Sequence, residues 1–161
     1  MDCNVVMTLP LLLYHFIPLH VFVFVLESTS GGMNTMNILV AVSDPETRES
    51  LMEALLLAGG AAHVEVSIVG ASSPSAGHEA LRDRPTDAVI ADFGDTSIGF
   101  FAEARSTTPD TARIILVTNE TARDAVPHIQ AGLLLRYLRR PWDSADCGNL
   151  LLQLQRICAK G

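Results

Sequence analysis

Five short segments with the length and composition of strands, separated by longer amphipathic segments, constrain the fold of this chain more than any other feature. These segments are NILVAV, HVEVSIV, DAVIAD, RIILVT and RYLR, at residues 37–42, 63–69, 87–92, 113–118 and 136–139. Each has the length of a strand, and apolar runs of this kind are typical of strands covered on both faces. Parallel strands need long crossover connections, so the alternation predicts a parallel sheet with helices on both of its faces.

Helices are expected in the intervals between these strands. The first begins at Pro45, which suits the first turn of a helix, and is expected to stop at Gly59 and Gly60. The others are expected at residues 75–84, 98–105, 121–131 and 144–158. Two apolar stripes predict buried helix faces, formed by Leu51, Leu55 and Ala58 in the first helix and by Leu150, Leu151, Leu154 and Ile157 in the last.

The amino-terminal residues 1–35 differ from the rest of the chain, because they contain no Lys or Arg. Within them, residues 5–26 are almost entirely apolar and are about long enough for a membrane helix, which needs roughly 20 residues. Three interpretations remain open: a membrane anchor, an apolar arm that packs on a partner, and a start codon assigned too early, with Met33 or Met36 as the true start. The predicted organisation is therefore an extension and linker at 1–35, followed by one domain at 36–161.

The charge and cysteine content exclude several classes of protein. Eleven basic residues against 18 acidic ones give a net charge of -7, which disfavours non-specific nucleic-acid binding. Cys3, Cys147 and Cys158 lack the spacing of a zinc site and are an odd number, so they do not indicate a disulfide scaffold. We also find no Gly-rich dinucleotide turn, P-loop or nucleophile elbow, so an enzyme is not expected.

Four motifs, in order, carry a resemblance to a known family: NILVAVSDPETR, DAVIADF, RIILVTN and RYLRRPWD. Over residues 37–160 the chain resembles the receiver (CheY-like) domain of two-component response regulators. The resemblance implies an α/β, flavodoxin-like, doubly wound fold: five parallel strands in the order 2-1-3-4-5 with five helices. In such sheets, sites form at the carboxyl ends of the strands.

The resemblance also implies roles for four residues. Asp92 matches the phosphoacceptor, Thr118 the hydroxyl that hydrogen-bonds the phosphoryl group, Arg140 the family's lysine, and Tyr137 the switch aromatic. Each has a plainer alternative. Asp92 could cap the next helix, Thr118 could be an ordinary strand residue, Arg140 a solvated cation, and Tyr137 a half-buried tyrosine.

The chain departs from the family where an acidic pair usually binds Mg²⁺. Val42 and Ser43 occupy those two positions, and neither is a carboxylate. Mg²⁺ prefers hard oxygen ligands and is usually held by one or two carboxylates. Asp92 and Asp44, with Asp95 in the next loop, are the remaining candidate ligands, so Mg²⁺ binding is expected to be weakened.

The resemblance implies a stand-alone receiver-type signalling domain of a bacterial two-component phosphorelay. Asp92 would accept a phosphoryl group from a histidine kinase or phosphotransfer protein, and the last two helices and fifth strand would contact a downstream protein. The alternative is a pseudo-receiver, an interaction module without phosphorylation or Mg²⁺ binding. A cytoplasmic location is expected, or a membrane-tethered one if residues 5–26 are an anchor.

Overall fold

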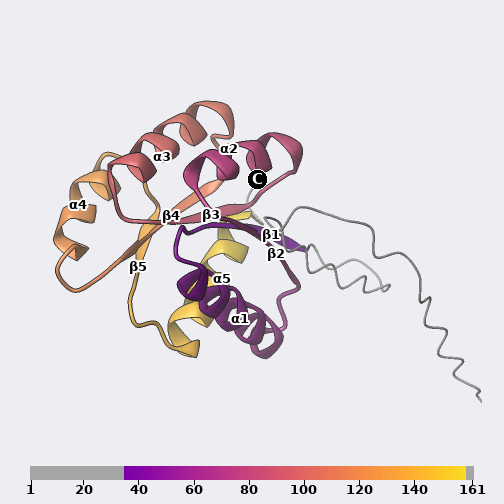
Figure 1. The fold of residues 1–161 in the computed structure, drawn as a ribbon. Coiled ribbons are helices and arrows are strands. Elements are labelled where there is room, and N and C mark those ends of the chain that lie inside the picture. The colour runs from indigo at the N-terminus through magenta and orange to yellow at the C-terminus, as the bar shows by residue number, and fades with distance from the viewer. Residues whose placement is uncertain (1–34, 159–161) are drawn as a thin grey trace, which may run out of the picture.

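Strands and helices alternate without exception in residues 35–158, the part of the chain that the computed structural model describes (Figure 1). Five parallel strands form one sheet in the order β2-β1-β3-β4-β5, which confirms the predicted fold and strand order. The strands are β1 (Met36–Ala41), β2 (Val66–Ala71), β3 (Ala88–Asp92), β4 (Ala112–Val117) and β5 (Arg136–Arg139). The helices are α1 (Pro45–Ala62), α2 (Pro74–Asp83), α3 (Asp95–Thr107), α4 (Ala122–Gln130) and α5 (Ser144–Cys158).

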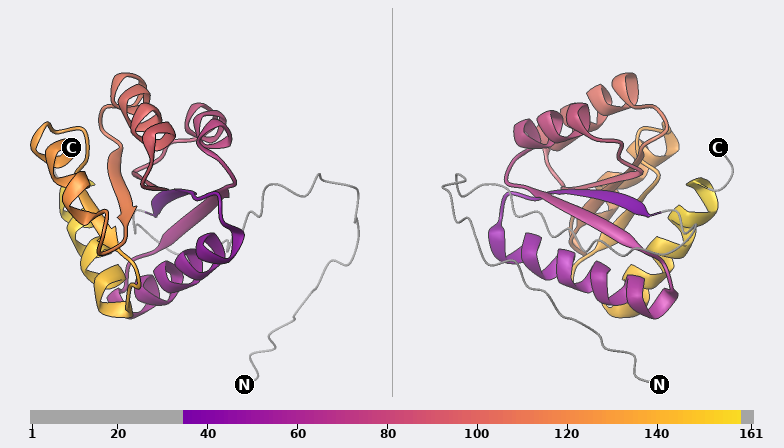
Figure 2. Two further views of the ribbon diagram at one scale, coloured as in Figure 1. Left: turned by 60° about the vertical axis from the view of Figure 1, so that its left-hand side comes forward. Right: turned by 90° about the vertical axis from the view of Figure 1, so that its right-hand side faces the viewer.

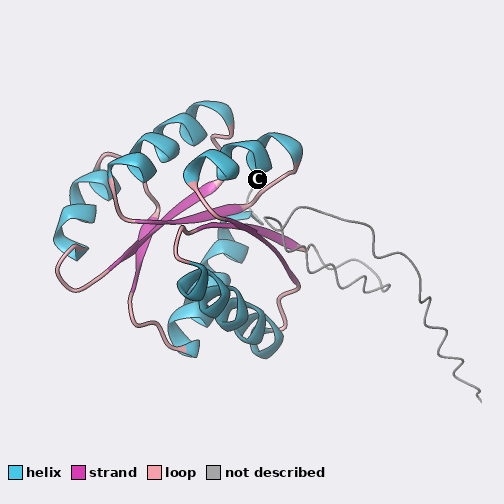
Figure 3. Ribbon diagram, in the orientation of Figure 1, coloured by secondary structure: helices cyan, strands magenta, loops and turns pink. Residues whose placement is uncertain are grey.

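The helices cover both faces of the sheet and divide the core into two layers. Helices α1 and α5 lie against each other on one face, and α2, α3 and α4 cover the other face (Figures 2 and 3). On the first face, Leu51 and Leu55 of α1 and Leu151 of α5 pack against the sheet and are fully buried. On the second face, Phe100 and Phe101 of α3 fill the same role. The central strands are therefore apolar on both sides, as their sequences predict.

The predicted end of the first helix was wrong. Helix α1 continues through Gly59 and Gly60 to Ala62 and ends at His63, whose backbone is left-handed at φ 55°. Gly59 lies against the start of β2, where a Cβ atom would come within 2.9 Å of the Val64 carbonyl oxygen. This glycine therefore allows close packing rather than ending the helix, and β2 begins at Val66, three residues later than expected.

The observed bounds of the other helices and strands differ less from the expected ones. Helix α3 begins at Asp95, earlier than expected, because the N–H groups of Ser97 and Ile98 both donate to the Gly94 carbonyl at 3.0 Å. Helix α5 has the predicted bounds, but Ile157 is 39% exposed, because the buried stripe of this helix ends one turn earlier at Leu154. The strand β5 has the predicted bounds as well.

The part of the chain that is described contains no helix both long and apolar enough to cross a membrane. The apolar residues 5–26, on which the interpretation as a membrane anchor depends, lie outside it. The same holds for the other two interpretations of residues 1–34.

The two neighbouring glycines of α1 give a test of this packing. At Gly60 a Cβ would meet no atom within 4 Å, so Gly60→Ala should stabilise the protein by about 0.5–1 kcal/mol through higher helix propensity. At Gly59 a Cβ would lie 2.8 Å from Val66 Cγ2, so Gly59→Ala should destabilise it by about 1–3 kcal/mol. Urea unfolding of both variants measures the change in the free energy of unfolding, which should rise for Gly60→Ala and fall for Gly59→Ala. Equal effects would show that α1 does not approach β2 this closely.

Candidate functional site

Three of the residues expected at the site lie at one edge of the sheet, where β3, β4 and β5 end. Asp92 is the last residue of β3 and pairs in register with Leu116 of β4. Thr118 directly follows β4, and Arg140 directly follows β5, where its N–H donates to the Val117 carbonyl at 2.8 Å. Parallel pairing therefore places Asp92, Thr118 and Arg140 on neighbouring strand ends, although they are far apart in sequence.

Asp92 is held by two contacts. Its Oδ1 atom accepts a hydrogen bond from the Arg140 guanidinium, and the two side chains form an ion pair. Its Oδ2 atom accepts a longer hydrogen bond, 3.3 Å, from the backbone N–H of Ser43. The Asp92 side chain is 29% exposed and that of Arg140 is 33% exposed, so the pair is partly open to solvent. Oδ2 is the more weakly held of the two oxygens.

Asp92 does not cap the helix that follows it. The N-cap residue of α3 is Gly94, and no side chain hydrogen-bonds that cap. Arg140 likewise pairs with Asp92, so it is not a fully solvated cation. The arrangement brings a carboxylate and a fixed cation together, and their role in phosphoryl transfer stays a prediction.

The Thr118 hydroxyl lies in the turn that leads into α4. It accepts a hydrogen bond from the N–H of Thr121 at 3.3 Å and lies 3.3 Å from the Thr121 hydroxyl. Both distances are at the long end for hydrogen bonds, so little is lost if the hydroxyl turns toward a ligand at Asp92. Tyr137 lies in β5 opposite Ile115, and the residue is 37% exposed. Its predicted function as a switch stays a prediction.

Asp44, the expected substitute metal ligand, is the N-cap of α1. Its Oδ2 atom accepts a hydrogen bond from the Thr47 N–H at 2.8 Å. Hydrogen bonding from Thr47 lowers the pKa of Asp44, and the charges of Arg140 and Arg48 lower it further. The carboxylate is therefore ionised at neutral pH but is already used to satisfy the backbone of its own helix.

The residues at this edge do not fit a Mg²⁺ site. Val42 is fully buried in the core, and Ser43 directs its backbone N–H, a donor, toward Asp92. Residues 35–158 contain no group of three or more His, Cys, Asp or Glu side chains placed to hold a metal ion. One oxygen of Asp92, Oδ1, already accepts a hydrogen bond from the Arg140 guanidinium. The expected weak Mg²⁺ affinity, through Asp92 and Asp44, stays a prediction.

Sequence reasoning missed the contacts that hold the first loop. The Ser43 N–H reaches Asp92, and the Arg48 guanidinium donates to the Val42 carbonyl at 2.8 Å. A third missed contact, the cap that Asp44 forms on α1, had a signal in the sequence. Asp44 directly precedes Pro45, and Asp before a proline at the first helical position is a common helix start. The Ser43 contact had none, because a backbone donor has no side-chain signature.

Solved structures resemble this chain over most of its length. A response regulator receiver domain protein from Clostridium thermocellum has a TM-score of 0.64 at 22% identity, covering 78% of this chain and 95% of its own. The response regulator TrrA of Thermotoga maritima, in complex with Mg²⁺ and BeF, has a TM-score of 0.60 at 20% identity, covering 74% and 98%. The chain has the fold of response-regulator receiver domains.

Other comparisons add two facts. A structure of an adenylate cyclase from Rhodopirellula baltica also matches this receiver fold, with a TM-score of 0.59 at 18% identity over 79% of this chain and 95% of its own. No model of a protein family matches the sequence, and no curated protein matches it either. The similarity therefore concerns the fold, and the function of the Asp92 edge rests on its own residues.

The N-cap at Asp44 predicts a pH dependence of stability. Because the native pKa is depressed, the stabilisation from this carboxylate is present above its unfolded pKa of about 3.9 and is lost as the pH falls through the native pKa. Asp44→Ala should therefore lower the melting temperature at pH 7, and the difference should shrink below about pH 4. Asp44→Asn, which keeps an acceptor at the cap, is the control, and its melting temperature at pH 7 should fall less. A difference that stays constant with pH would contradict this assignment.

The Asp92 edge also predicts how Mg²⁺ binding could be strengthened. Ser43 is exposed and adjacent to Asp92, whereas Val42 is buried, so Ser43→Asp adds a hard ligand without a charge in the core. We expect Mg²⁺ affinity, measured by titration calorimetry, to rise about tenfold or more. Ser43→Asn is the matched control, with similar size and no charge. Unchanged affinity in Ser43→Asp would mean that this side chain cannot reach a metal at Asp92.

Proposed function

We propose that residues 36–161 form a receiver-type signalling domain in which Asp92 accepts a phosphoryl group. The observation that carries this proposal is the ion pair between Asp92 and Arg140 at the carboxyl edge of the sheet. A carboxylate nucleophile is repelled by an anionic phosphoryl group unless nearby charge is neutralised. Arg140 supplies such a positive charge next to the nucleophile, and Asp92 is exposed enough for a donor to approach.

The chemistry follows from the two oxygens of Asp92. Arg140 holds Oδ1, so the weakly bonded Oδ2 attacks the phosphorus atom and forms the new O–P bond. The bond between phosphorus and the leaving group breaks, and the leaving group, a histidine imidazole or acetate, takes the electron pair. The Thr118 hydroxyl donates a hydrogen bond to a phosphoryl oxygen once it leaves Thr121. The remaining N–H groups of the guanidinium suit the other phosphoryl oxygens.

The proposed donor is a histidine kinase or a phosphotransfer protein of a bacterial two-component system, in the cytoplasm. The proposed output surface is formed by α4, β5 and α5. Four large apolar residues are exposed there: Val126 at 40%, Tyr137 at 37%, Leu152 at 40% and Ile157 at 39%. The basic side chains Arg123 and Arg139 are exposed on the same elements, which suits an acidic or mixed partner surface. In this proposal the domain is a signalling module and not an enzyme.

One observation favours a second candidate, a pseudo-receiver that binds partners without phosphoryl chemistry. The residues at the Asp92 edge do not fit Mg²⁺, because Val42 is buried and Asp44 caps α1. In a pseudo-receiver, the ion pair between Asp92 and Arg140 would never be broken by a phosphoryl group. It would serve to hold the ends of β3 and β5 together. The two candidates differ in whether Asp92 becomes modified.

Intact-protein mass spectrometry after incubation with acetyl phosphate, with and without Mg²⁺, tests the proposal. We expect a single phosphoryl adduct in the unaltered chain and none in Asp92→Asn. Arg140→Ala should form the adduct about tenfold or more slowly, because it loses the neutralising charge, while Arg140→Lys should retain part of the rate. No adduct on a folded protein would overturn the proposal and leave the pseudo-receiver.

A further inference from the structure

The polar groups that contact Asp92 within the described residues are hydrogen-bond donors. The Ser43 N–H lies 3.3 Å from Oδ2, and the Arg140 guanidinium donates to Oδ1. The Thr118 hydroxyl, which can also donate, lies just after the neighbouring strand β4. Donors bind the oxygen atoms of an anion, whereas a divalent cation needs oxygen atoms that act as ligands themselves. The edge around Asp92 therefore has the composition of an oxyanion site rather than that of a cation site.

Several oxygen atoms of the loops next to Asp92 already accept hydrogen bonds. Asp44 Oδ2 accepts one from the Thr47 N–H at 2.8 Å, and the Val42 carbonyl accepts one from the Arg48 guanidinium at 2.8 Å. In the loop after β3, the Gly94 carbonyl accepts from two N–H groups in the first turn of α3, both at 3.0 Å. A metal ion at Asp92 would therefore compete with existing hydrogen bonds for its further protein ligands.

The charges at this edge also oppose a divalent cation. Asp92 and Arg140 form an ion pair and together contribute no net charge. Hydrogen bonding from Thr47 lowers the pKa of Asp44, so this second carboxylate is ionised at neutral pH. The charges of Arg140 and Arg48 lower that pKa further, because both guanidinium groups lie near the loop. Two carboxylates are thus balanced by two guanidinium groups, and a cation that approaches Asp92 is repelled by Arg140.

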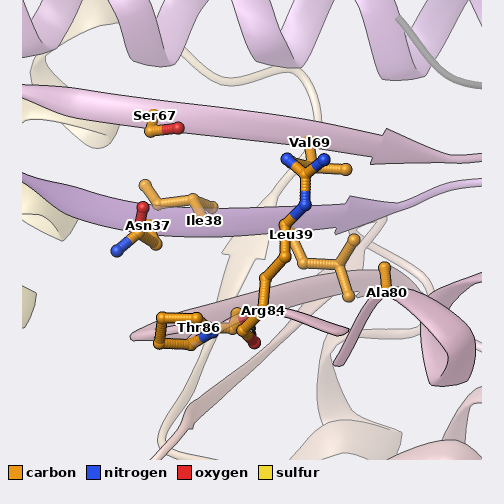
Figure 4. Close-up of a pocket in the computed structure, with 9 residues that line it drawn as sticks. Asn37, Ile38, Leu39, Ser67, Val69, Ala80, Arg84 and Thr86 are labelled. Carbon is orange, nitrogen blue, oxygen red and sulfur yellow. Dashed lines mark hydrogen bonds between the residues drawn. The ribbon is translucent and has the colours of Figure 1, made fainter. Parts of the chain in front are cut away.

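A groove on the face that carries α2 offers no alternative cation site (Figure 4). It has a volume of about 160 Å³, and Arg84 is the one charged residue among its described lining residues. Asn37 at the start of β1 and Thr86 just before β3 line it, so it lies toward the edge of the sheet opposite Asp92. The groove therefore supplies no carboxylate that could hold a metal ion for the chemistry at Asp92.

We infer that phosphoryl transfer to Asp92 proceeds without a divalent cation, with Arg140 as the permanent positive charge of the site. This inference rests on the proposed function. A lone pair of Asp92 Oδ2 forms the O–P bond, the bond from phosphorus to the leaving group breaks, and the leaving group departs with the electron pair. Arg140 offsets the added negative charge, and the Ser43 N–H, 3.3 Å from Oδ2, is within reach of the new phosphoryl oxygens. No further reactant enters the step.

Intact-protein mass spectrometry of the full chain, freed of metal ions and given acetyl phosphate, tests this inference. The initial rate of adduct formation, less any adduct in Asp92→Asn, should differ by less than about threefold between excess EDTA and excess Mg²⁺, because a cation that took part in the step would change the rate by far more. A rate that rises more than about threefold with Mg²⁺ would overturn the inference and leave the proposed function intact. Absence of the adduct in both conditions, on a folded protein, would overturn both.

An added metal ligand gives the second part of the test. Ser43→Asp places a carboxylate beside Asp92 that repels the phosphoryl group, so its rate in EDTA should fall about tenfold, and Mg²⁺ should restore it. Ser43→Asn, the matched control without the charge, should react at similar rates in EDTA and in Mg²⁺. Any effect of Mg²⁺ on acetyl phosphate itself is common to both variants. A response to Mg²⁺ as strong in Ser43→Asn as in Ser43→Asp would overturn the inference, because it would need no added ligand.

Discussion

Burial of the parallel sheet on both faces is the constraint on which the rest of this structure depends. Val89 and Ile90 of β3 and Ile114 and Ile115 of β4 are fully buried, on alternate faces. Polar side chains in the middle of these strands would lose their hydration without gaining partners. Chemistry is therefore confined to the strand ends, and parallel pairing gathers those ends at one edge. Asp92 lies at the first position in β3 where a charge can reach solvent.

The ion pair of Asp92 and Arg140 is the main electrostatic feature of that edge. Partial burial removes some of the hydration of both groups, and each offsets this loss for the other. The guanidinium differs from an ammonium because it is planar and carries five donors, so it can hold one carboxylate oxygen and still contact a second anion. In the proposed phosphoryl transfer, the fixed cation of Arg140 would serve the same electrostatic need as a bound cation.

The sequence alone was sufficient to predict the alternation of strands and helices along the chain, because the first, third and fourth strands are nearly continuous apolar runs with helical patterns between them. The same information placed Asp92, Thr118 and Arg140 at one edge. It failed for Gly59, because the reason for this glycine is a contact with Val66, which no local pattern contains. It also failed for the Ser43 N–H, because the backbone donor at 3.3 Å from Asp92 exists only once β1 and β3 are paired.

The first loop shows why a helix cap and a metal site compete in this chain. Asp44 satisfies the Thr47 N–H, one of the donors that a helix start leaves without an intrahelical partner. If its carboxylate moved to a metal at Asp92, that donor would lose its acceptor, and a metal at the weakly held Oδ2 would displace the Ser43 N–H. Metal binding would therefore break two existing contacts, while Val42 and Ser43 add no carboxylate in return. Charge neutralisation at Asp92 is thus assigned to Arg140, a residue of the fold itself.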